Sequence, residues 1–382
     1  MKILNNQRNV MKKKICHLTS VHTRYDVRIF VKECTSLAAA GYEVSLIVND
    51  GQKNEIKNGV NIISTQYIAQ NRIDRILNST REIYKKAIEV NADLYHFHDP
   101  ELLLIASKLK RKGKVVVFDS HEFTGKQIEC REYLNKSFRK LLSFFYLKYE
   151  KHVLKKIDAV IVPCTYNGVH YFEKKCKREV LVDNLPILEE VLLNRELLDA
   201  GEKKACYIGS LSEERGIKKI VEASSLIKIP LLLAGNFSPA HLEREIVDSE
   251  KNPQVSYLGV VDRTGIKKIL SEAYMGMCVL QDSGQYKFTD NLPTKVCEYM
   301  AAGIPIIVSD FPYSKKMIDK YKCGIYVNPN DTHSIANAMK WLLENPKEAK
   351  EMGKNGRNLV ETKLNWKFEV KKIILLYESL LS

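Results

Sequence analysis

The chain has 382 residues, which exceeds the size at which one hydrophobic core usually keeps growing, so we expect two domains. Its 45% apolar and 28% charged residues are typical of a globular protein, and no apolar run approaches the roughly 20 residues that cross a bilayer. The nine cysteines form no C-x-x-C pair, and most of the +14 net charge lies in residues 1–190, where 33 Lys and Arg face 22 Asp and Glu.

Short β-rich apolar runs alternate with longer amphipathic segments along the chain, which is the pattern of β-α units around parallel sheets. In the first half, strands are predicted at residues 14–20, 42–49, 61–66, 93–99, 114–121 and 158–164. Residues 183–204 show no clean strand or helix period. In the second half, strands are predicted at residues 205–210, 230–236, 255–261, 276–281, 304–310 and 324–329.

This pattern predicts an α/β protein with two doubly wound, Rossmann-like domains that face a central cleft. We place the N-terminal domain at residues 1–185, a linker at 186–204 and the C-terminal domain at 205–364. Residues 365–382 form an amphipathic C-terminal helix that is expected to pack toward the N-terminal domain. Ligands of such sheets bind beyond the carboxyl ends of the strands, so functional residues should directly follow strands.

The basic first half favours an anionic partner, such as nucleic acid, a phospholipid surface or a phosphorylated small molecule. No nucleic-acid partner is expected, because aromatic and basic residues are not interleaved as in a known binding module. The chain contains no G-x-G, no G-x-x-x-x-G-K-[ST] and no D-x-D, which argues against a dinucleotide enzyme, a P-loop enzyme and a metal-bound sugar nucleotide. The basic N-terminus runs into the strand-like ICHLTS, so we expect no signal peptide and a cytoplasmic location.

One candidate anion site lies in YIGSLSEERGIKKIVEA, residues 207–223. Arg215 and Gly216 stand at the start of a predicted helix that follows a strand. A guanidinium beside the free N–H groups of a helix start suits a diphosphate. A solvated arginine would fit the same pattern, so the assignment depends on residues further along the chain.

Those residues lie in DNLPTKVCEYMAAGIPIIVSD, residues 290–310. Leu292 and Pro293 fit the first turn of a helix, where the missing N–H of proline is tolerated. N–H groups near Thr294 and Lys295 then form a second positive end, and Glu298 lies about one turn further on. A carboxylate at that position suits a ribose diol. The alternative is that Asp290, just before the helix, is only its cap and that Glu298 pairs with a lysine.

Polar residues of the first half give weaker signals. His96 and His98 alternate with apolar residues and so point to one face of a strand. They resemble zinc ligands, but without a third ligand at helical spacing structural hydrogen bonding is favoured. Asp26 and Arg28 either shape the acceptor side of the cleft or belong to a simple helix cap.

Residues 131–156 hold eight Lys or Arg against two Glu, together with Phe138, Phe144, Phe145 and Tyr146. A basic helix with apolar and aromatic residues can lie at an anionic membrane surface. It can also be a core helix whose aromatic residues pack on the sheet, and the two roles are compatible if only one face is buried. We therefore expect peripheral attachment to the inner face of the cell membrane.

The chain resembles glycosyltransferase family 4, the retaining GT-B transferases of bacterial polysaccharide and glycolipid assembly. The resemblance is carried by DVRIFVKECTSLAAAGYEV, YHFHDPELL, VVFDSHEF, GSLSEERGI and EYMAAGIPIIVSDFP. The family's E-x7-E motif falls on Asp290 to Glu298, with Asp in place of the first Glu. Where the family often has G-R-x-x-x-x-K-G, Arg215 takes the lysine's place and Lys295 is the candidate for the other cation.

The resemblance implies catalytic roles for His121, Arg215 and Asp290. His121, after the strand VVFD, would touch the transferring sugar. The residues expected to bind the donor are Ser210, Arg215, Asn291, Leu292, Thr294, Lys295 and Glu298.

The expected function is retaining transfer of a hexose-type sugar from a nucleoside diphosphate sugar, a UDP-sugar above others, in cell-surface polysaccharide biosynthesis. The acceptor is expected to be a glycan or a lipid-linked molecule, and neither a metal nor another cofactor is expected. Two alternatives stay open: a sugar-nucleotide epimerase of GT-B fold, which would need acid-base residues of its own, and a non-catalytic sugar-nucleotide-binding subunit.

Overall fold

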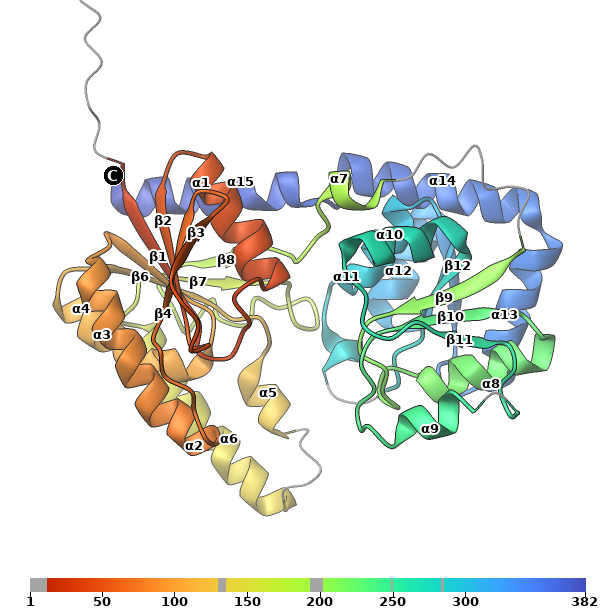
Figure 1. Cartoon of the computed structure of the whole chain (residues 1–382), viewed down its shortest axis with the longest axis horizontal. Coiled ribbons are helices and arrows are strands. Elements are labelled where there is room, and N and C mark those ends of the chain that lie inside the picture. Colours follow the sequence, from red (N-terminus) through yellow and green to blue (C-terminus); the bar gives the residue numbers. More distant parts are fainter. Residues whose placement is uncertain (1–11, 130–134, 193–201, 249, 283–284) are drawn as a thin grey trace, which may run out of the picture. The chain divides into compact units, whose positions relative to one another are not determined.

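The computed structural model describes residues 12–129, 135–192, 202–248, 250–282 and 285–382 (Figure 1). Contacts divide the chain into two compact units. Unit 1 takes the described residues up to Pro163 together with His170–Val182 and Val370–Ser382, and unit 2 takes Cys164–Val169 and Asp183–Glu369. Each unit is built around its own largely parallel sheet with helices on both faces, which confirms the predicted α/β class.

Unit 1 contains an eight-stranded sheet with the order β3-β4-β2-β1-β5-β6-β7-β8. Its strands are β1 (Lys14–Leu18), β2 (Glu43–Val48), β3 (Glu55–Lys57), β4 (Val60–Ser64), β5 (Leu94–Phe97), β6 (Val115–Asp119), β7 (Ala159–Val162) and β8 (Glu179–Leu181). All pairs are parallel except that of β3 with β4. The six strands predicted for this half are present. The edge strands β3 and β8 were not predicted, because three residues are too few to show a period.

Helices cover both faces of this sheet. They are the π-helical segment η1 (Val27–Cys34), α1 (Thr35–Ala39), α2 (Arg72–Asp74), η2 (Arg75–Ser79), α3 (Thr80–Val90), η3 (Pro100–Leu102), α4 (Leu103–Arg111), α5 (Thr124–Glu129) and α6 (Lys136–Leu154). Right-handed crossovers place α3, α4 and α6 on one face, where they contact one another in series, and η1 with α1 on the other (Figure 1). Because both faces are covered, β1, β5 and β6 are almost wholly buried.

Unit 2 contains a six-stranded, all-parallel sheet with the order β11-β10-β9-β12-β13-β14. Its strands are β9 (Lys204–Ile208), β10 (Leu231–Ala234), β11 (Val255–Tyr257), β12 (Ala273–Cys278), β13 (Ile306–Ser309) and β14 (Gly324–Val327). All six were predicted from the sequence. Their apolar runs, bounded by Gly, Pro, Asn and Asp, are typical of strands buried on both faces.

The helices of unit 2 close two separate apolar layers, one on each face of the sheet. They are α7 (Leu188–Val191), α8 (Ile217–Ile227), α9 (Leu242–Ile246), α10 (Arg263–Glu272), η4 (Tyr286–Phe288), α11 (Thr294–Ala301), α12 (Pro312–Tyr321), α13 (Thr332–Glu344) and α14 (Pro346–Thr362). The short α7 lies within the predicted linker, whose residues 193–201 lie outside the described residues. The helices α8 and α13 pack together, as do α11 and α14.

The last helix, α15 (Trp366–Leu381), starts in unit 2, where the backbone N–H of Trp366 donates to the carbonyl of Pro186. Its residues from Val370 onward belong to unit 1, where Tyr377 is fully buried. No helix in the described ranges is both long and apolar enough to span a membrane.

Candidate functional site

The loop between β9 and α8 presents Arg215 at the carboxyl end of the unit 2 sheet. Gly216 is the N-cap of α8, with a φ of 76° that favours glycine, and a Cβ there would lie 1.9 Å from the carbonyl oxygen of Val279. Only glycine therefore lets the loop pass so close to the segment after β12. The guanidinium of Arg215 lies over the ring of Tyr286, with 4.7 Å between Cζ and the ring centre.

Lys295, in the first turn of α11, points toward the same loop. Its ammonium lies 3.6 Å from the ring centre of Tyr207, the last but one residue of β9. Gly209 makes room for it, since a Cβ on Gly209 would stand 2.8 Å from Lys295 Nζ. Burial lowers the pKa of Lys295 to about 8, and repulsion from Arg215 contributes to the decrease.

The structure thus brings together the two cations that the sequence assigned to a diphosphate. Within the part of the chain that the structure describes, neither Arg215 nor Lys295 forms an ion pair with a carboxylate, and each lies over an aromatic ring instead. Burial is the main cause of the lowered pKa of Lys295, and the charge of Arg215 lowers it further. An anion bound between the loop and α11 would relieve this repulsion.

Glu298 lies one turn further along α11 and is nearly buried, with 8% of its surface exposed. One oxygen accepts a hydrogen bond of 2.9 Å from Arg263, at the start of α10. Arg263 also forms an ion pair of 2.8 Å with Glu190. The alternative that Glu298 pairs with a lysine is wrong, because its partner is an arginine. Arg263 fixes the carboxylate and leaves the second oxygen of Glu298 available to a ligand hydroxyl.

Asp290 is not the cap of α11. That helix begins at Thr294, after the predicted first-turn residues Leu292 and Pro293, and its N-cap Pro293 makes no side-chain cap hydrogen bond. One oxygen of Asp290 accepts hydrogen bonds of 2.6 Å from the hydroxyl of Thr165 and from the backbone N–H of Gly168. The side chain therefore anchors the segment Cys164–Val169 of unit 2, which leaves the other carboxylate oxygen for a ligand.

The other predicted donor-binding residues lie around this core of the site. Asn291 donates to Asp183 at 3.3 Å, and the hydroxyl of Thr294 donates to the carbonyl of Asn184 at 3.0 Å. Leu292 is buried in the apolar layer below α11. The side chains of Asn291 and Thr294 are thus bonded to Asp183 and Asn184, and that of Leu292 is in the core. These three residues can therefore offer a donor mainly their backbone groups.

Ser210 ends the short turn after β9 and is exposed. Its carbonyl oxygen accepts a hydrogen bond of 2.8 Å from the hydroxyl of Tyr207. The bond fixes the ring over which Lys295 lies. Ser210 therefore lies in the same β9–α8 loop as Arg215, which Lys295 approaches from α11, and Ser210 itself is at the surface.

His121 belongs to unit 1, where it follows β6 at the carboxyl edge of the sheet. Its Nε2 lies 3.2 Å from the carboxylate of Asp119 and 3.1 Å from Nδ1 of His98. Arg28 holds Asp119 by two hydrogen bonds of 2.8 and 3.0 Å. Although burial opposes ionisation, Arg28 and the neighbouring histidines keep the pKa of Asp119 well below its usual range. Asp119 thus orients the ring of His121.

The segment DVR at the head of η1 has two distinct functions. The carboxylate of Asp26 accepts hydrogen bonds of 2.9 Å from the backbone N–H groups of Arg28 and Ile29, so Asp26 is a helix cap. Asp26 also lies 3.3 Å from His22, and this contact outweighs burial and lowers the pKa of Asp26 to about 2. Arg28 instead points inward to Asp119 and is only 5% exposed.

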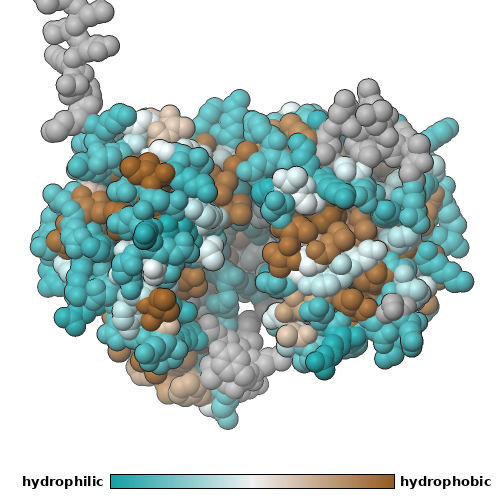
Figure 2. All heavy atoms as spheres, viewed as in Figure 1, coloured by the Kyte–Doolittle hydropathy of each residue, from teal (hydrophilic) through white to brown (hydrophobic). Residues whose placement is uncertain are grey.

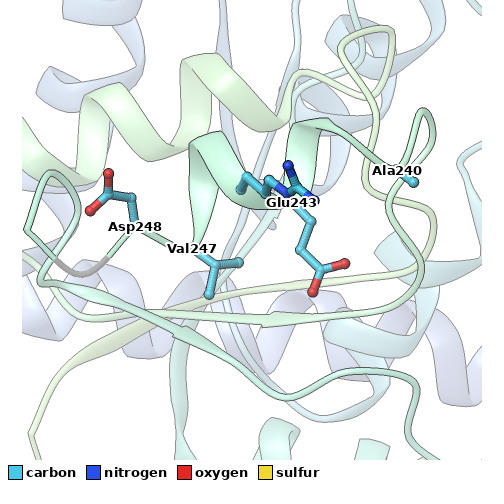
Figure 3. Close-up of a pocket in the computed structure, with 5 residues that line it drawn as sticks. Ala240, Glu243, Val247 and Asp248 are labelled. Carbon is cyan, nitrogen blue, oxygen red and sulfur yellow. The ribbon is translucent and has the colours of Figure 1, made fainter.

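Sequence reasoning missed Arg263, Glu190, Tyr207 and Tyr286. Nothing in their local sequence marks them, because their roles arise from contacts between distant elements. A separate shallow pocket beside α9, lined by Ala240, Glu243, Arg244, Val247 and Asp248, contains none of the predicted site residues (Figure 3).

Two family models match the chain and together cover most of it. Residues 27–168 match the model of Glycosyltransferase Family 4, and residues 189–359 match that of Glycosyl transferases group 1. The uncharacterised glycosyltransferase MJ1069 of Methanocaldococcus jannaschii is 24% identical over 325 residues, which are 78% of this chain and 77% of that protein.

Solved structures show the same fold at lower identity. Sucrose-phosphate synthase from Thermosynechococcus elongatus is 20% identical with a TM-score of 0.77, covering 97% of this chain and 99% of that one. Anabaena HepE in complex with UDP and glucose is 11% identical with a TM-score of 0.70, covering 96% of this chain and 100% of that one. With its two parallel Rossmann-like sheets and long C-terminal helix, the chain has the GT-B fold, and by the two models it belongs to glycosyltransferase family 4.

Proposed function

We propose that this glycosyltransferase moves a hexose-type sugar from a UDP-sugar to a glycan or lipid-linked acceptor and retains the anomeric configuration. The observation that carries the proposal is the pair of cations, Arg215 and Lys295, that face the same loop without a carboxylate partner among the described residues. A diphosphate supplies the missing negative charge. The UDP and glucose bound to the similar structure of Anabaena HepE support uridine as the nucleoside.

In the proposed reaction, the acceptor hydroxyl attacks the anomeric carbon on the face from which the diphosphate leaves. A new bond forms between the acceptor oxygen and that carbon, and the bond between the carbon and the β-phosphate oxygen breaks. The acceptor proton passes to the departing phosphate oxygen. Negative charge grows on the β-phosphate during this step, and Arg215 and Lys295 are preorganised to stabilise it.

The nucleoside end of the donor would bind near Glu298. A ribose has two neighbouring hydroxyl donors, and a carboxylate fixed by Arg263 can accept from both. The two cations beside the β9–α8 loop stabilise charge and replace a metal ion at the diphosphate. His121, whose ring Asp119 orients, would contact the transferring sugar.

Unit 1, the unit proposed to bind the acceptor, is proposed to bind a membrane surface. Helix α6 exposes five large apolar side chains to solvent: Phe138, Leu141, Leu142, Phe144 and Phe145. Figure 2 shows apolar surface at the lower edge of unit 1, the end of that unit where Figure 1 draws α6. The opposite face of the helix is buried, with Ser143 and Glu150 each 1% exposed, so one helix serves both the core and the surface.

Transfer of labelled sugar tests the proposal. UDP-sugars labelled in the hexose are incubated with the full chain and a lipid extract, and labelled product is separated from donor. We expect product with the wild type, and a loss on the order of 10²- to 10³-fold with Arg215→Ala. Arg244→Ala, which removes an exposed arginine of the same unit, is the matched control. Donor binding without any product would favour a non-catalytic subunit, and conversion of the free sugar nucleotide would favour an epimerase.

A further inference from the structure

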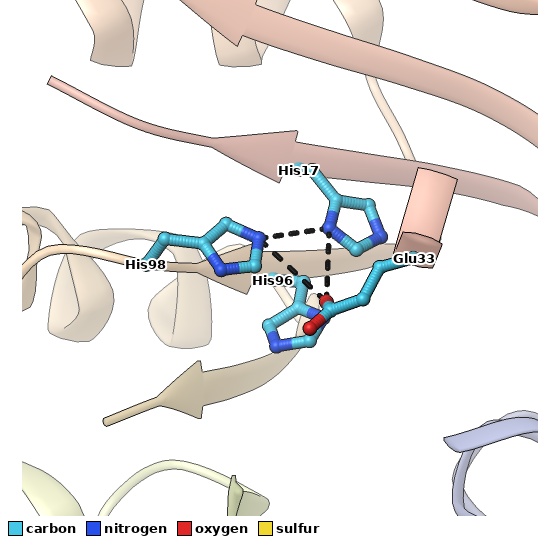
Figure 4. A group of neighbouring side chains, drawn as sticks. All are labelled: His17, Glu33, His96 and His98. Carbon is cyan, nitrogen blue, oxygen red and sulfur yellow. Dashed lines mark hydrogen bonds and ion pairs between the residues drawn. The ribbon is translucent and has the colours of Figure 1, made fainter. Parts of the chain in front are cut away.

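A second group of functional side chains lies in the interior of unit 1. We call His17, Glu33, His96 and His98 the histidine cluster (Figure 4). His17 comes from β1, His96 and His98 come from β5 and the residue just beyond it, and Glu33 comes from η1. Their exposed fractions lie between 0 and 2%. Four potential metal ligands therefore meet in the core of unit 1.

The sheet register explains why these residues meet. His17 and His96 are direct neighbours on the parallel strands β1 and β5, and His98 lies two residues beyond His96 on the same face. Segment η1 covers that face and adds Glu33. The sequence favoured structural hydrogen bonding for His96 and His98 because no third ligand stood at helical spacing. The structure supplies a third ligand from another strand and a fourth from η1.

All four ligand atoms lie within 4.8 Å of one another, and four of their six separations are near those around one tetrahedral ion. Glu33 Oε2 is 3.8 Å from His17 Nδ1, 3.7 Å from His96 Nδ1 and 3.9 Å from His98 Nε2. His17 Nδ1 and His98 Nε2 are 2.9 Å apart. In a tetrahedral zinc site with bonds of about 2.0 to 2.1 Å, neighbouring ligand atoms lie about 3.3 Å apart. The observed separations fall on both sides of this value.

The polar atoms of the cluster are poorly satisfied by the protein. Both carboxylate oxygens of Glu33 are buried without a hydrogen-bond partner. Arg28 Nε lies 3.2 Å from Glu33 Oε1, but the same guanidinium already holds Asp119. One arginine thus faces two buried carboxylates. His121 also faces Asp119, so Glu33 is the carboxylate that a further cation, either a metal ion or a proton, would balance.

We propose that His17, Glu33, His96 and His98 form a structural site for one Zn²⁺ ion. Three imidazoles and one carboxylate are a ligand set that zinc accepts, and four protein ligands without an open position are typical of a structural site. The second ring nitrogen of His98 lies 3.6 Å from Asp119, as in the carboxylate–histidine pairs that orient metal ligands. The site does not depend on the proposed transfer reaction.

Tyr377 competes with such an ion for one ligand atom. Its hydroxyl lies 2.6 Å from His96 Nδ1 and 3.5 Å from His17 Nε2. An ion bound to His96 Nδ1 would take over the lone pair that faces the phenol. Removing the hydroxyl therefore should not weaken zinc binding, whereas it should weaken a network held by hydrogen bonds alone.

The test measures the zinc content of the full chain. Untagged protein is purified from cells grown with Zn²⁺, and bound metals are quantified by mass spectrometry. We expect one zinc ion per chain in the wild type and in the control His152→Gln, which alters an exposed histidine of α6. Glu33→Gln and His98→Gln should lose the ion. Changing a partner of a metal ligand weakens metal affinity roughly 10- to 100-fold, and removal of a ligand itself should weaken zinc affinity by more than that. Tyr377→Phe should keep it.

A second measurement on the wild type alone guards against variants that fail to fold. After chelation, Co²⁺ is added as a spectroscopic probe, and we expect the intense visible bands of a tetrahedral site that Zn²⁺ then removes. Wild-type protein that contains no stoichiometric zinc and gives no such bands would overturn the proposal. It would mean that a proton balances Glu33 and that the cluster is a hydrogen-bonded network. Folded Glu33→Gln and His98→Gln variants that retain zinc would also overturn it.

Discussion

Lys295 illustrates how the proposed donor site depends on single residues. Its ammonium is held between the ring of Tyr207 and the backbone of Gly209, where a larger residue would collide with it. The same burial that positions the amine lowers its pKa to about 8. The charge of this residue is therefore lost at a lower pH than that of a surface lysine.

This lowered pKa predicts how UDP binding varies with pH. Between about pH 7, where the terminal phosphate of UDP is ionised, and about pH 8 the amine is charged in the free protein and the dissociation constant should be constant. Above pH 8 the protein must take up a proton to bind the diphosphate, so affinity should fall by about tenfold per pH unit. Titration calorimetry at intervals of about half a pH unit, from about pH 6 to about pH 9.5, checks this. Lys295→Arg should remove the fall, and an unchanged slope in that variant would assign it to another group.

The pH dependence of folding stability that Lys295 contributes has the opposite sign to that of UDP binding. Because the folded pKa of Lys295 lies below its unfolded value, the unfolded chain binds more protons between the two values. The contribution of Lys295 to the free energy of unfolding therefore rises with pH through about 8, while donor binding weakens over the same range. A common loss of fold and binding above pH 8 would contradict this account.

Glu298 gives a second prediction at the residue scale. If its free oxygen accepts from the ribose, Glu298→Gln should weaken UDP binding about 10- to 100-fold, which corresponds to one hydrogen bond to a charged group. The turnover number at saturating donor should change much less. Glu272→Gln, an exposed carboxylate of α10, is the control. Unchanged UDP affinity in Glu298→Gln would limit Glu298 to its structural pair with Arg263.

The sequence predicted part of this chemistry and missed the rest for a physical reason. Arg215 and Glu298 could be assigned because a helix start after a strand gives a local pattern. Arg263 could not, because its contact with Glu298 joins α10 to α11 across 35 residues of sequence. The hydrogen bonds of Asp290 to Thr165 and Gly168 span more than 120 residues and leave no local signal.

At the scale of elements, strands were easier to predict than helix surfaces. All twelve predicted strands are present, because each is a short β-rich run, and the central strands are buried on both faces. Helix α6 was ambiguous, since a basic and aromatic segment fits both a core and a membrane surface. The structure shows which side chains each face holds, and the exposed face carries Phe138, Phe144 and Phe145.

This exposed face predicts binding to anionic vesicles. In sedimentation with liposomes, bound protein should increase with the fraction of anionic lipid and decrease with salt. Arg139→Glu with Lys140→Glu should weaken binding through charge, and Phe144→Ser with Phe145→Ser should weaken it through lost apolar burial. Lys340→Glu with Lys354→Glu, two exposed lysines of unit 2, is the control. Equal recovery with neutral and anionic vesicles would contradict a membrane role for α6.

At the scale of the whole molecule, each unit places polar residues at the carboxyl edge of a parallel sheet, which is where doubly wound sheets bind ligands. In unit 2 these residues follow β9 and β12, and in unit 1 they follow β1, β5 and β6. The class and topology were predictable because β-α alternation fixes them. The histidine cluster was not, because its ligands come from three separate elements.

The positive charge at the proposed donor site predicts that transfer does not require a divalent metal there. Arg215, Lys295 and the two helix starts should stabilise the leaving diphosphate. Activity measured directly after addition of EDTA should therefore equal that of the untreated enzyme. A loss that Mg²⁺ or Mn²⁺ restores would place a required metal ion beside the diphosphate.

The central claim is that Arg215 and Lys295 bind the diphosphate of the donor. Calorimetric titration of UDP into the wild type and into folded Arg215→Ala, Lys295→Ala and the double variant tests it most directly, with uridine as the ligand that lacks phosphate. We expect each single change to weaken UDP binding by about 1.5 to 3 kcal/mol, the two effects to be non-additive, and uridine binding to be equal in all four proteins. UDP affinity that is unchanged in the double variant would contradict the account.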